Sequence, residues 1–464
     1  MPCVYRTHPT AVRVSRVRPP GGTGRLAGGL RPPADGRASR PAYSDRVSDS
    51  QKQQRVVIVG AGMAGVQTAV QLREQGWPGS VRLIGAEPHA PYDRPPLSKA
   101  VLLGKGEEAQ APLFEIDFAN LDIELELGRT VTGLRADERL LVTDAGPVHY
   151  DRLVLATGAE PVALPGSEGV PGVHLLRTLD DAQRLRPVLA ARGRIVVVGA
   201  GWIGAEFATA ARERGCEVTV VEAADTPLPG ALPTQVTEPM RAWYAEAGAT
   251  LRTGVAVESV ERGGVLLADG TRLAADAVLV GIGARPATGW LRGSGVELGP
   301  DGAVLADARL RAAVPGGHDA GVYAVGDCAS FPSARYGERL LIHHWDNALQ
   351  GPRTVAANLL AEGHADGEAD TVVYDPVPYF WSEQFGRFVQ YIGHHAEGDE
   401  LVWRGSPDGA AWSVCWLRGE RLAALLAVGR PRDLAQGRKL IQQGTAVERT
   451  LVRDAAVALK QAAR

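Results

Sequence analysis

The chain has 464 residues, of which 45% are hydrophobic and 22% charged, as is typical of a globular protein with room for about three domains. No apolar run approaches the ~20 residues that a membrane-spanning helix requires, so we expect no membrane partner. After the first fifty residues, which hold nine Arg and three Asp, the rest of the chain carries 41 basic and 50 acidic residues, which argues against a nucleic-acid partner.

Residues 1–53 are rich in Arg, Pro, Gly and Ala and lack hydrophobic periodicity. Such a segment cannot bury enough apolar surface to offset its ordering entropy, so we predict a disordered arm. It has no apolar region of the length that a secretory signal needs. The alternatives are a targeting or nucleic-acid arm, or a true start at Val47, and we expect residues 1–46 to be dispensable.

The first predicted unit is a strand, a glycine-rich turn, a helix and a second strand that ends near the acid Glu87. In chain order these are residues 56–59, the turn of Gly60, Gly62 and Gly65, residues 66–75, and residues 81–84. A strand then runs through 153–156 into a small-residue turn that contains Thr157 and Gly158.

A second copy of the unit follows, and this duplication is the most informative feature of the chain. Its parts are residues 195–198, the turn of Gly199, Gly201 and Gly204, the helix 205–214, and the strand 218–221, which ends at the acid Glu222. Two GxGxxG turns, each inside a complete βαβ unit with an acid about 20 residues later, are a strong indication of two dinucleotide sites.

The residue types in these units follow from how a dinucleotide binds. The first Gly permits a tight turn, the second lets the backbone approach a pyrophosphate, and the third lets the helix pack against the strand. The pyrophosphate then lies at a helix N-terminus, and the acid accepts hydrogen bonds from ribose hydroxyls. No Arg follows Glu222, which would repel a 2′-phosphate, so the second site is predicted to prefer NADH to NADPH.

Downstream, a strand at 277–280 leads into a turn that contains Gly283, and the strand at 323–325 delivers Asp327 to a turn or helix. A polar start at 343–348 precedes a helix-like run that is predicted to reach Leu360. The pattern then changes to short antiparallel strands at 388–392, 400–404, 411–417 and 421–428, with a helix after Pro431. The predicted fold class is α/β, with two nested Rossmann-like domains and a C-terminal α+β domain.

From about residue 54 to its end, the chain resembles the putidaredoxin reductase-like ferredoxin reductases that serve bacterial ring-hydroxylating dioxygenases and cytochromes P450. Apoptosis-inducing factor is a more distant relative. The specific motifs are PYDRPPLSK at 91–99, the Ala-Thr-Gly turn at 156–158, Gly326-Asp327, and FWSEQ at 380–384, where relatives commonly have FWSDQ.

The resemblance implies an FAD-binding domain in two parts, 54–161 and 282–370, an NAD-binding domain at 162–281, and a C-terminal domain at 371–464. It implies cofactor-binding roles for a set of residues that includes both glycine turns. For FAD these are Gly60, Gly62, Gly65, Glu87, Arg94, Lys99, Thr157, Gly158, Asp327 and Trp345, and for NAD they are Gly199, Gly201, Gly204, Glu206, Glu222 and Gly283.

The resemblance also pairs Lys99 with Glu206 beside flavin N5 as the catalytic residues. Trp345 and Trp381 are expected either to stack near the isoalloxazine or to pack at a domain interface. The N-terminus of the helix-like run that follows the polar segment 343–348 is expected to face the flavin. His343 and His344 lack the spacing of metal ligands, and we predict no metal site.

The four cysteines, Cys3, Cys216, Cys328 and Cys415, form no CxxC pair, which suits a reducing cytoplasm. Disulfide reductases in related families need a cysteine near the flavin, yet none occurs between residues 56 and 151. We therefore predict an NADH-oxidising flavoprotein that passes electrons from FAD to a 2Fe-2S ferredoxin, as a monomer or weak dimer. The alternatives are an NADH oxidase or quinone reductase, and a redox-sensing protein resembling apoptosis-inducing factor.

Overall fold

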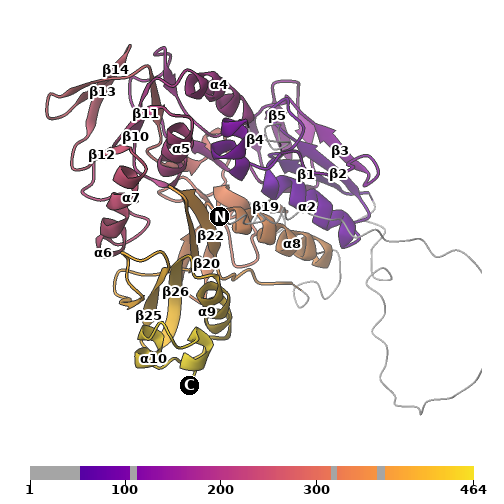
Figure 1. Cartoon of the computed structure of the whole chain (residues 1–464). Helices are drawn as coiled ribbons and strands as arrows, with labels where there is room; N and C mark the ends of the chain where they lie inside the picture. Colours follow the sequence, from indigo (N-terminus) through magenta and orange to yellow (C-terminus); the bar gives the residue numbers. More distant parts are fainter. Residues whose placement is uncertain (1–52, 105–111, 315–320, 363–370) are drawn as a thin grey trace, which may run out of the picture.

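The computed structural model describes residues 53–104, 112–314, 321–362 and 371–464 (Figure 1). The predicted N-terminal arm, except for residue 53, lies outside these ranges. Within them, no helix is long and apolar enough to cross a lipid bilayer.

The first predicted unit forms as expected. Its elements are β1 (Arg55–Val59), α2 (Met63–Glu74) and β2 (Ser80–Ile84). β1 pairs in parallel with β2 and with β7 (Arg152–Leu155), and its four residues after Arg55 are buried. The sheet is completed by β3 (Ile123–Glu126) and β19 (Val322–Ala324), in the order β19-β7-β1-β2-β3.

The second unit repeats the first. Its elements are β10 (Arg194–Val198), α5 (Trp202–Glu213) and β11 (Glu217–Val221). Its parallel sheet adds β12 (Thr250–Arg252), β16 (Ala277–Val280) and β9 (Val173–His174), in the order β12-β11-β10-β16-β9. The apolar runs read from the sequence as buried strands are therefore the central strands of two separate sheets.

The second unit is inserted into the first. The chain leaves through β8 (Ala159–Pro161) and returns through β17 (Ala284–Pro286), and these two strands pair antiparallel side by side. β19 then rejoins the first sheet next to β7. The nested arrangement of the two Rossmann-like units is thus confirmed.

Both glycine-turn helices begin three residues earlier than the sequence pattern predicted. α2 starts at Met63 and α5 at Trp202, because the second glycine of each turn takes an extended backbone conformation and serves as the N-cap. The third glycine therefore lies inside the first helical turn. Hydrophobic periodicity does not report this start, because the backbone conformation of a glycine sets it.

Helix α8 (Trp345–Ala361) packs against α2, where Val355 and Leu359 join Val66 and Ala69 in one buried cluster. Small sheets complete the nested units. They are β4 (Val131–Arg135), β5 (Leu140–Thr143) and β6 (Val148–His149), then β13 (Val257–Glu261), β14 (Gly264–Leu267) and β15 (Arg272–Ala274), and β18 (Val304–Leu305), β20 (Ala329–Ser333) and β21 (Glu338–Leu341).

Shorter helices connect these strands. They are the 3-10 turn Pro95–Ser98, α3 (Ala100–Leu103), α4 (Leu179–Ala190), α6 (Thr234–Thr237), α7 (Arg241–Glu246), and the 3-10 turns Glu238–Met240, Gly289–Leu291 and Gly326–Cys328. α4 begins with a capping box, in which the Thr178 hydroxyl accepts from the Asp181 N–H and the Asp181 carboxylate accepts from the Thr178 N–H.

The C-terminal region is a five-stranded antiparallel sheet in the order β22-β23-β26-β25-β24. Its strands are β22 (Tyr379–Gln384), β23 (Arg387–Gly393), β24 (Glu400–Arg404), β25 (Trp412–Arg418) and β26 (Arg421–Val428). After it come α9 (Pro431–Gln443), α10 (Arg449–Arg453) and the 3-10 turn Leu459–Ala462. This confirms the predicted run of short strands and the helix after Pro431.

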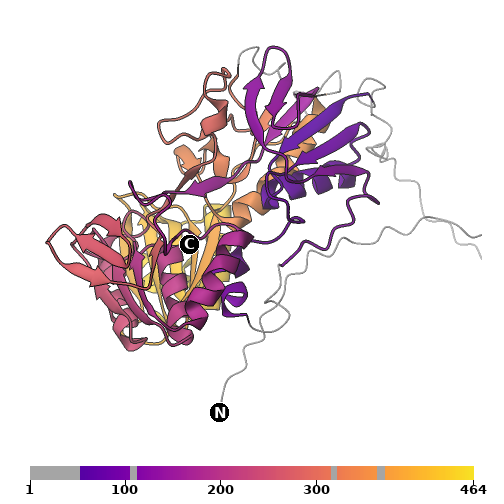
Figure 2. The same ribbon diagram turned by 90° about the horizontal axis from the view of Figure 1, so that it is seen from above.

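The two faces of this sheet have different partners. Trp412 and Trp416 share a buried cluster with Phe207 and Tyr244 of the second unit, whereas Cys415 packs with Leu440 of α9. Figure 2 shows the first unit in indigo on one side of the molecule and the second unit in magenta on the other, with the yellow C-terminal sheet beside the second unit. One face of the C-terminal sheet therefore packs against the second unit, and α9 covers the other face.

Candidate functional site

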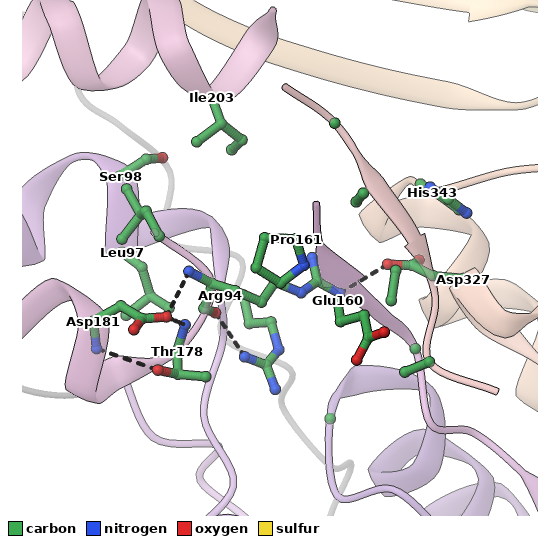
Figure 3. A pocket seen from close by; sticks show the side chains of 18 of the residues that line it. Arg94, Leu97, Ser98, Glu160, Pro161, Thr178, Asp181, Ile203, Asp327 and His343 are labelled. Carbon is green, nitrogen blue, oxygen red and sulfur yellow. Dashed lines mark hydrogen bonds and ion pairs between the residues drawn. The ribbon is translucent and has the colours of Figure 1, made fainter. Parts of the chain in front are cut away.

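A cavity of about 1350 Å³ runs between the two nested units and is bordered by β22. A pocket for one small ligand usually measures about 300 to 1,000 Å³, so this cavity has room for more than one. Figure 3 shows side chains from both units facing it, with Ser98 and Asp181 on one side and Asp327 and His343 on the other.

Most of the residues that the resemblance assigned to cofactors line this cavity. They are Gly60, Gly62, Glu87, Arg94, Lys99, Thr157, Gly158, Asp327 and Trp345 from the FAD set, and Gly199, Gly201, Glu206, Glu222 and Gly283 from the NAD set. Gly65 and Gly204 do not line it. A Cβ on Gly65 would lie 1.8 Å from the carbonyl oxygen of Gly60, and one on Gly204 would lie 2.2 Å from that of Gly199. These two glycines permit close packing within the turn and do not contact the cavity.

The middle glycine of the first turn faces open space instead. A Cβ on Gly62 would meet no protein atom within 4 Å. The first N–H groups of α2 have no side-chain cap, and Gly62, Met63 and Ala64 line the cavity. Uncapped N–H groups at the positive end of a helix dipole bind anions, so this turn fits a pyrophosphate.

The two acids that end the second strands are held differently. The Glu222 carboxylate accepts from the N–H groups of Ala200, at 2.8 Å, and Ala224, at 3.0 Å. The Glu87 carboxylate accepts from the Tyr92 hydroxyl and pairs with the Arg94 guanidinium at 2.7 Å. Both acids are fixed at the cavity wall, where a ribose would approach.

Asp327 has a partner that the sequence did not predict. The Arg177 guanidinium lies 3.0 Å from its carboxylate, and the Arg177 carbonyl accepts from Arg94 at 2.7 Å. Two guanidinium groups thus lie at one part of the cavity, each paired with a carboxylate. Arg177 directly precedes the α4 capping box, so its local sequence context indicates only a helix start.

The ion pair that the resemblance implied is present. Lys99 Nζ lies 2.7 Å from Glu206 Oε2, and their side chains are 21% and 6% exposed. Glu206 also accepts from the hydroxyls of Ser98, at 2.5 Å, and Ser382, at 2.8 Å. The two serines were not predicted to contribute, although both lie in motifs that carried the resemblance.

Aromatic rings close one side of the cavity. The His344 imidazole stacks on Phe380 with centroids 4.9 Å apart, and the Trp202 ring meets Phe380 edge-on at 4.4 Å. Trp345 and Trp381 meet edge-on at 5.8 Å, and the Trp345 indole donates to Asp93. Both tryptophans therefore line the cavity and also join segments of the first unit and the C-terminal sheet.

The start of α8 faces the same cavity. His343, His344, Trp345 and Ala348 line it, and no side chain caps the helix N-terminus. Burial lowers the pKa of His344 to about 4, so its imidazole is neutral at pH 7. The His343 side chain is exposed at the cavity, whereas His344 packs against Phe380.

The open space at Gly62, the uncapped starts of α2 and α5, and the two acids fixed at the cavity wall fit a site for two dinucleotides.

No cysteine is among the described residues that line the cavity. Cys328 follows Asp327, but its thiol is buried and points to the carbonyls of Leu155 and Val325. Burial raises the pKa of the Cys328 thiol, which keeps it protonated. The cavity therefore offers no thiol redox centre next to a cofactor.

Comparisons with known proteins agree with this geometry. Residues 54–351 match the pyridine nucleotide-disulphide oxidoreductase family, and residues 379–463 match the reductase C-terminal family. Rhodocoxin reductase of Rhodococcus erythropolis is 36% identical, covering 83% of this chain and 89% of its own. The ferredoxin reductase component of chlorobenzene dioxygenase from a Cupriavidus strain is 38% identical, covering 86% and 95%.

A solved structure gives the same result for the fold. The covalent complex of putidaredoxin reductase with putidaredoxin contains a chain that is 33% identical, with a TM-score of 0.80. The match covers 88% of this chain and 97% of that one. The match extends over both nested units and the C-terminal sheet.

Proposed function

The chain belongs to the pyridine nucleotide-disulphide oxidoreductase family, whose members use FAD and NAD(H), and we propose that it is an NADH:ferredoxin oxidoreductase. The observation that carries the proposal is one cavity that joins two dinucleotide turns and contains no cysteine among its described lining residues. Electrons that enter there have no thiol to receive them, so they leave for an external acceptor.

In this proposal the first unit holds FAD. Gly60 and Gly62 admit the pyrophosphate to the start of α2, Glu87 binds the adenosine ribose, and Asp327 binds the ribityl chain. Arg94, Thr157, Gly158 and Trp345 complete the site, and we add Arg177 because its guanidinium lies at Asp327. FAD supplies the redox chemistry, since it accepts a hydride and releases the two electrons one at a time.

The second unit holds NADH through Gly199 and Gly201, with Gly283 at the facing turn. Glu222 accepts from the ribose hydroxyls and repels the 2′-phosphate of NADPH, so NADH is the preferred coenzyme. Both hydrogen bonds to Glu222 come from backbone N–H groups, so its carboxylate keeps lone pairs for the ribose.

Lys99 and Glu206 lie where the two nucleotide sites meet. We assign them to the catalytic site, where the Lys99 ammonium stabilises negative charge that develops on reduction and Glu206 sets the position of that ammonium. A cation in a partly buried site stabilises a nearby negative charge more strongly than it would in water, because less solvent screens the interaction.

The external acceptor is, in this proposal, a 2Fe-2S ferredoxin that feeds an oxygenase such as a cytochrome P450 or a ring-hydroxylating dioxygenase. Relatives are named rhodocoxin reductase and the ferredoxin reductase component of chlorobenzene dioxygenase, a neighbour is the ferredoxin reductase for the CYP199A2 system, and another was solved as a complex with putidaredoxin. We place the protein in the cytoplasm as a monomer or weak dimer that binds no nucleic acid. The free, buried Cys216, Cys328 and Cys415 suit that reducing compartment.

The domain limits follow the same assignment. We propose 54–161 and 282–370 as the two parts of the FAD domain, 162–281 as the NAD domain, and 371–464 as the C-terminal domain. Strands β8 and β17, through which the chain passes between the two domains, lie next to the two ends of the NAD domain.

The test is reduction of cytochrome c by NADH, with and without a 2Fe-2S ferredoxin. We expect rapid reduction only when ferredoxin is present. Equal rates without ferredoxin, with oxygen or a quinone consumed instead, would select an oxidase or quinone reductase. A long-lived complex of reduced flavin with NAD, together with a change in oligomeric state, would select a redox-sensing protein.

A further inference from the structure

Glu206 is the meeting point of three parts of the chain. It lies on α5 of the second unit, and its side chain is 6% exposed. Ser98 and Lys99 reach it from the segment that follows the first glycine-turn unit. Ser382 and the N–H of Glu383 reach it from β22 of the C-terminal sheet.

The donors are divided between the two carboxylate oxygens. Oε2 accepts from Ser98, at 2.5 Å, and from Lys99, at 2.7 Å. Oε1 accepts from Ser382, at 2.8 Å, and from the N–H of Glu383, at 3.2 Å. Oε1 is therefore bound to the C-terminal sheet, while Oε2 is shared by Ser98 and Lys99 of the first unit.

The orientation of the Ser382 hydroxyl is itself fixed. Ser382 is fully buried, and its oxygen accepts from the Gln384 amide at 3.2 Å. With that contact taken, its own hydrogen is directed to Glu206. Relatives commonly have Asp at position 383. The contact with Glu206 comes from the backbone N–H of this residue, so Glu383 makes it as Asp would.

A buried carboxylate that loses a hydrogen-bond donor is less stabilised in its charged form, and its remaining contacts fix its orientation less well. Loss of the Ser382 donor would leave Oε1 with the backbone N–H alone among these donors. The carboxylate would then attract the Lys99 ammonium more strongly. It would neutralise more of the positive charge that Lys99 presents to the cavity.

We propose that Ser382 is a positioning residue for flavin reduction, through which the C-terminal domain controls the Lys99–Glu206 pair. The inference rests on the proposed function, because it assigns a purpose to the charge that Lys99 presents. It gives the C-terminal sheet a part in the reductive step, in addition to covering the second unit.

The experiment compares Ser382→Ala with Ser413→Ala in the FAD-loaded protein. Ser413 is a matched control, because it is also fully buried in the C-terminal sheet and donates to a paired carboxylate, Asp433, at 2.8 Å. The readouts are the rate of flavin reduction by NADH in stopped flow, the flavin midpoint potential, and the thermal unfolding midpoint.

We expect Ser382→Ala to slow reduction about tenfold, in line with the loss of one hydrogen bond to a charged group, and to make the potential more negative. Ser413→Ala should lower the unfolding midpoint but leave rate and potential unchanged. Ser382→Thr keeps the hydroxyl, so its reduction rate and midpoint potential should stay close to those of the wild type. In a Glu206→Gln background, Ser382→Ala should have little further effect, since the two residues act through one contact.

A wild-type rate and potential in Ser382→Ala would overturn the inference, as would equal changes in Ser413→Ala. If Ser382→Ala does not fold, Gln384→Met tests the same chain of contacts, with an expected slowing of about threefold. An unchanged rate in that variant would also count against it. Failure of the wild-type flavin to be reduced by NADH would instead overturn the proposed function, so the two failures are distinguishable.

Discussion

The ammonium of Lys99 lies 2.7 Å from the Glu206 carboxylate, although the residues are 107 positions apart. Removing one partner of a buried ion pair costs about 3 to 5 kcal/mol, because the surviving charge loses its compensation. We predict that Lys99→Ala and Glu206→Ala each slow flavin reduction, and that their effects in the double variant are not additive. Stopped-flow reduction by NADH measures this.

Lys439→Ala is the control for this prediction, because Lys439 is exposed on α9. Its flavin should be reduced at the wild-type rate. Additive losses in the double variant, or a wild-type rate in Lys99→Ala, would show that the pair does not act as a unit.

The two glycine positions in the first turn should respond differently to a side chain. Gly62→Val should fold but fail to retain FAD, because its side chain enters open cavity space. Gly65→Ala should destabilise the chain itself, since its Cβ would lie 1.8 Å from the Gly60 carbonyl oxygen. The ratio of flavin to protein absorbance and the thermal midpoint separate these results. Full FAD content in Gly62→Val would refute the pyrophosphate assignment.

Much of the fold was predictable because its signals are local. Each βαβ unit combines an apolar strand run with a glycine turn that permits only one kind of close packing, and both signals lie within 30 residues. The helix starts were less accurate, because Gly62 and Gly201 act as N-caps through backbone conformation, which hydrophobic periodicity does not report.

The site was only partly predictable because its contacts are distant in sequence. Glu206 was matched to Lys99 through family resemblance alone, since nothing in the α5 sequence distinguishes it from another helix carboxylate. Ser382 lies in the recognised FWSEQ motif, but its function depends on β22 reaching α5. Arg177 was not predicted for a similar reason, because its partner Asp327 is 150 positions away.

Coenzyme preference should depend on Glu222. A carboxylate that faces the 2′-phosphate of NADPH repels it, so we predict an NADH preference of more than about tenfold in kcat/KM. Glu222→Arg should narrow or reverse the preference, and Glu222→Gln should narrow it. Glu217→Gln, exposed on the same strand, is the control and should keep the preference. Equal use of both coenzymes by the wild type would exclude this role.

The last prediction concerns the effect of pH on stability through His344. Burial lowers the pKa of this imidazole from the ordinary 6.5 to about 4. The nearby Asp327 raises the pKa, and His343 and His394 lower it further. Between pH 6.5 and 4 the unfolded chain binds a proton at this imidazole that the folded chain does not. Stability from this group is therefore present above pH 6.5 and is lost as the pH falls toward 4, by up to about 3 kcal/mol.

His344→Phe, which keeps a ring against Phe380, should unfold with a shallower pH dependence in that window. The exposed His149→Gln is the control and should follow the wild-type curve. Urea unfolding with excess FAD from pH 4 to 7 measures the difference, and parallel curves for wild type and His344→Phe would show that His344 is not held neutral by burial.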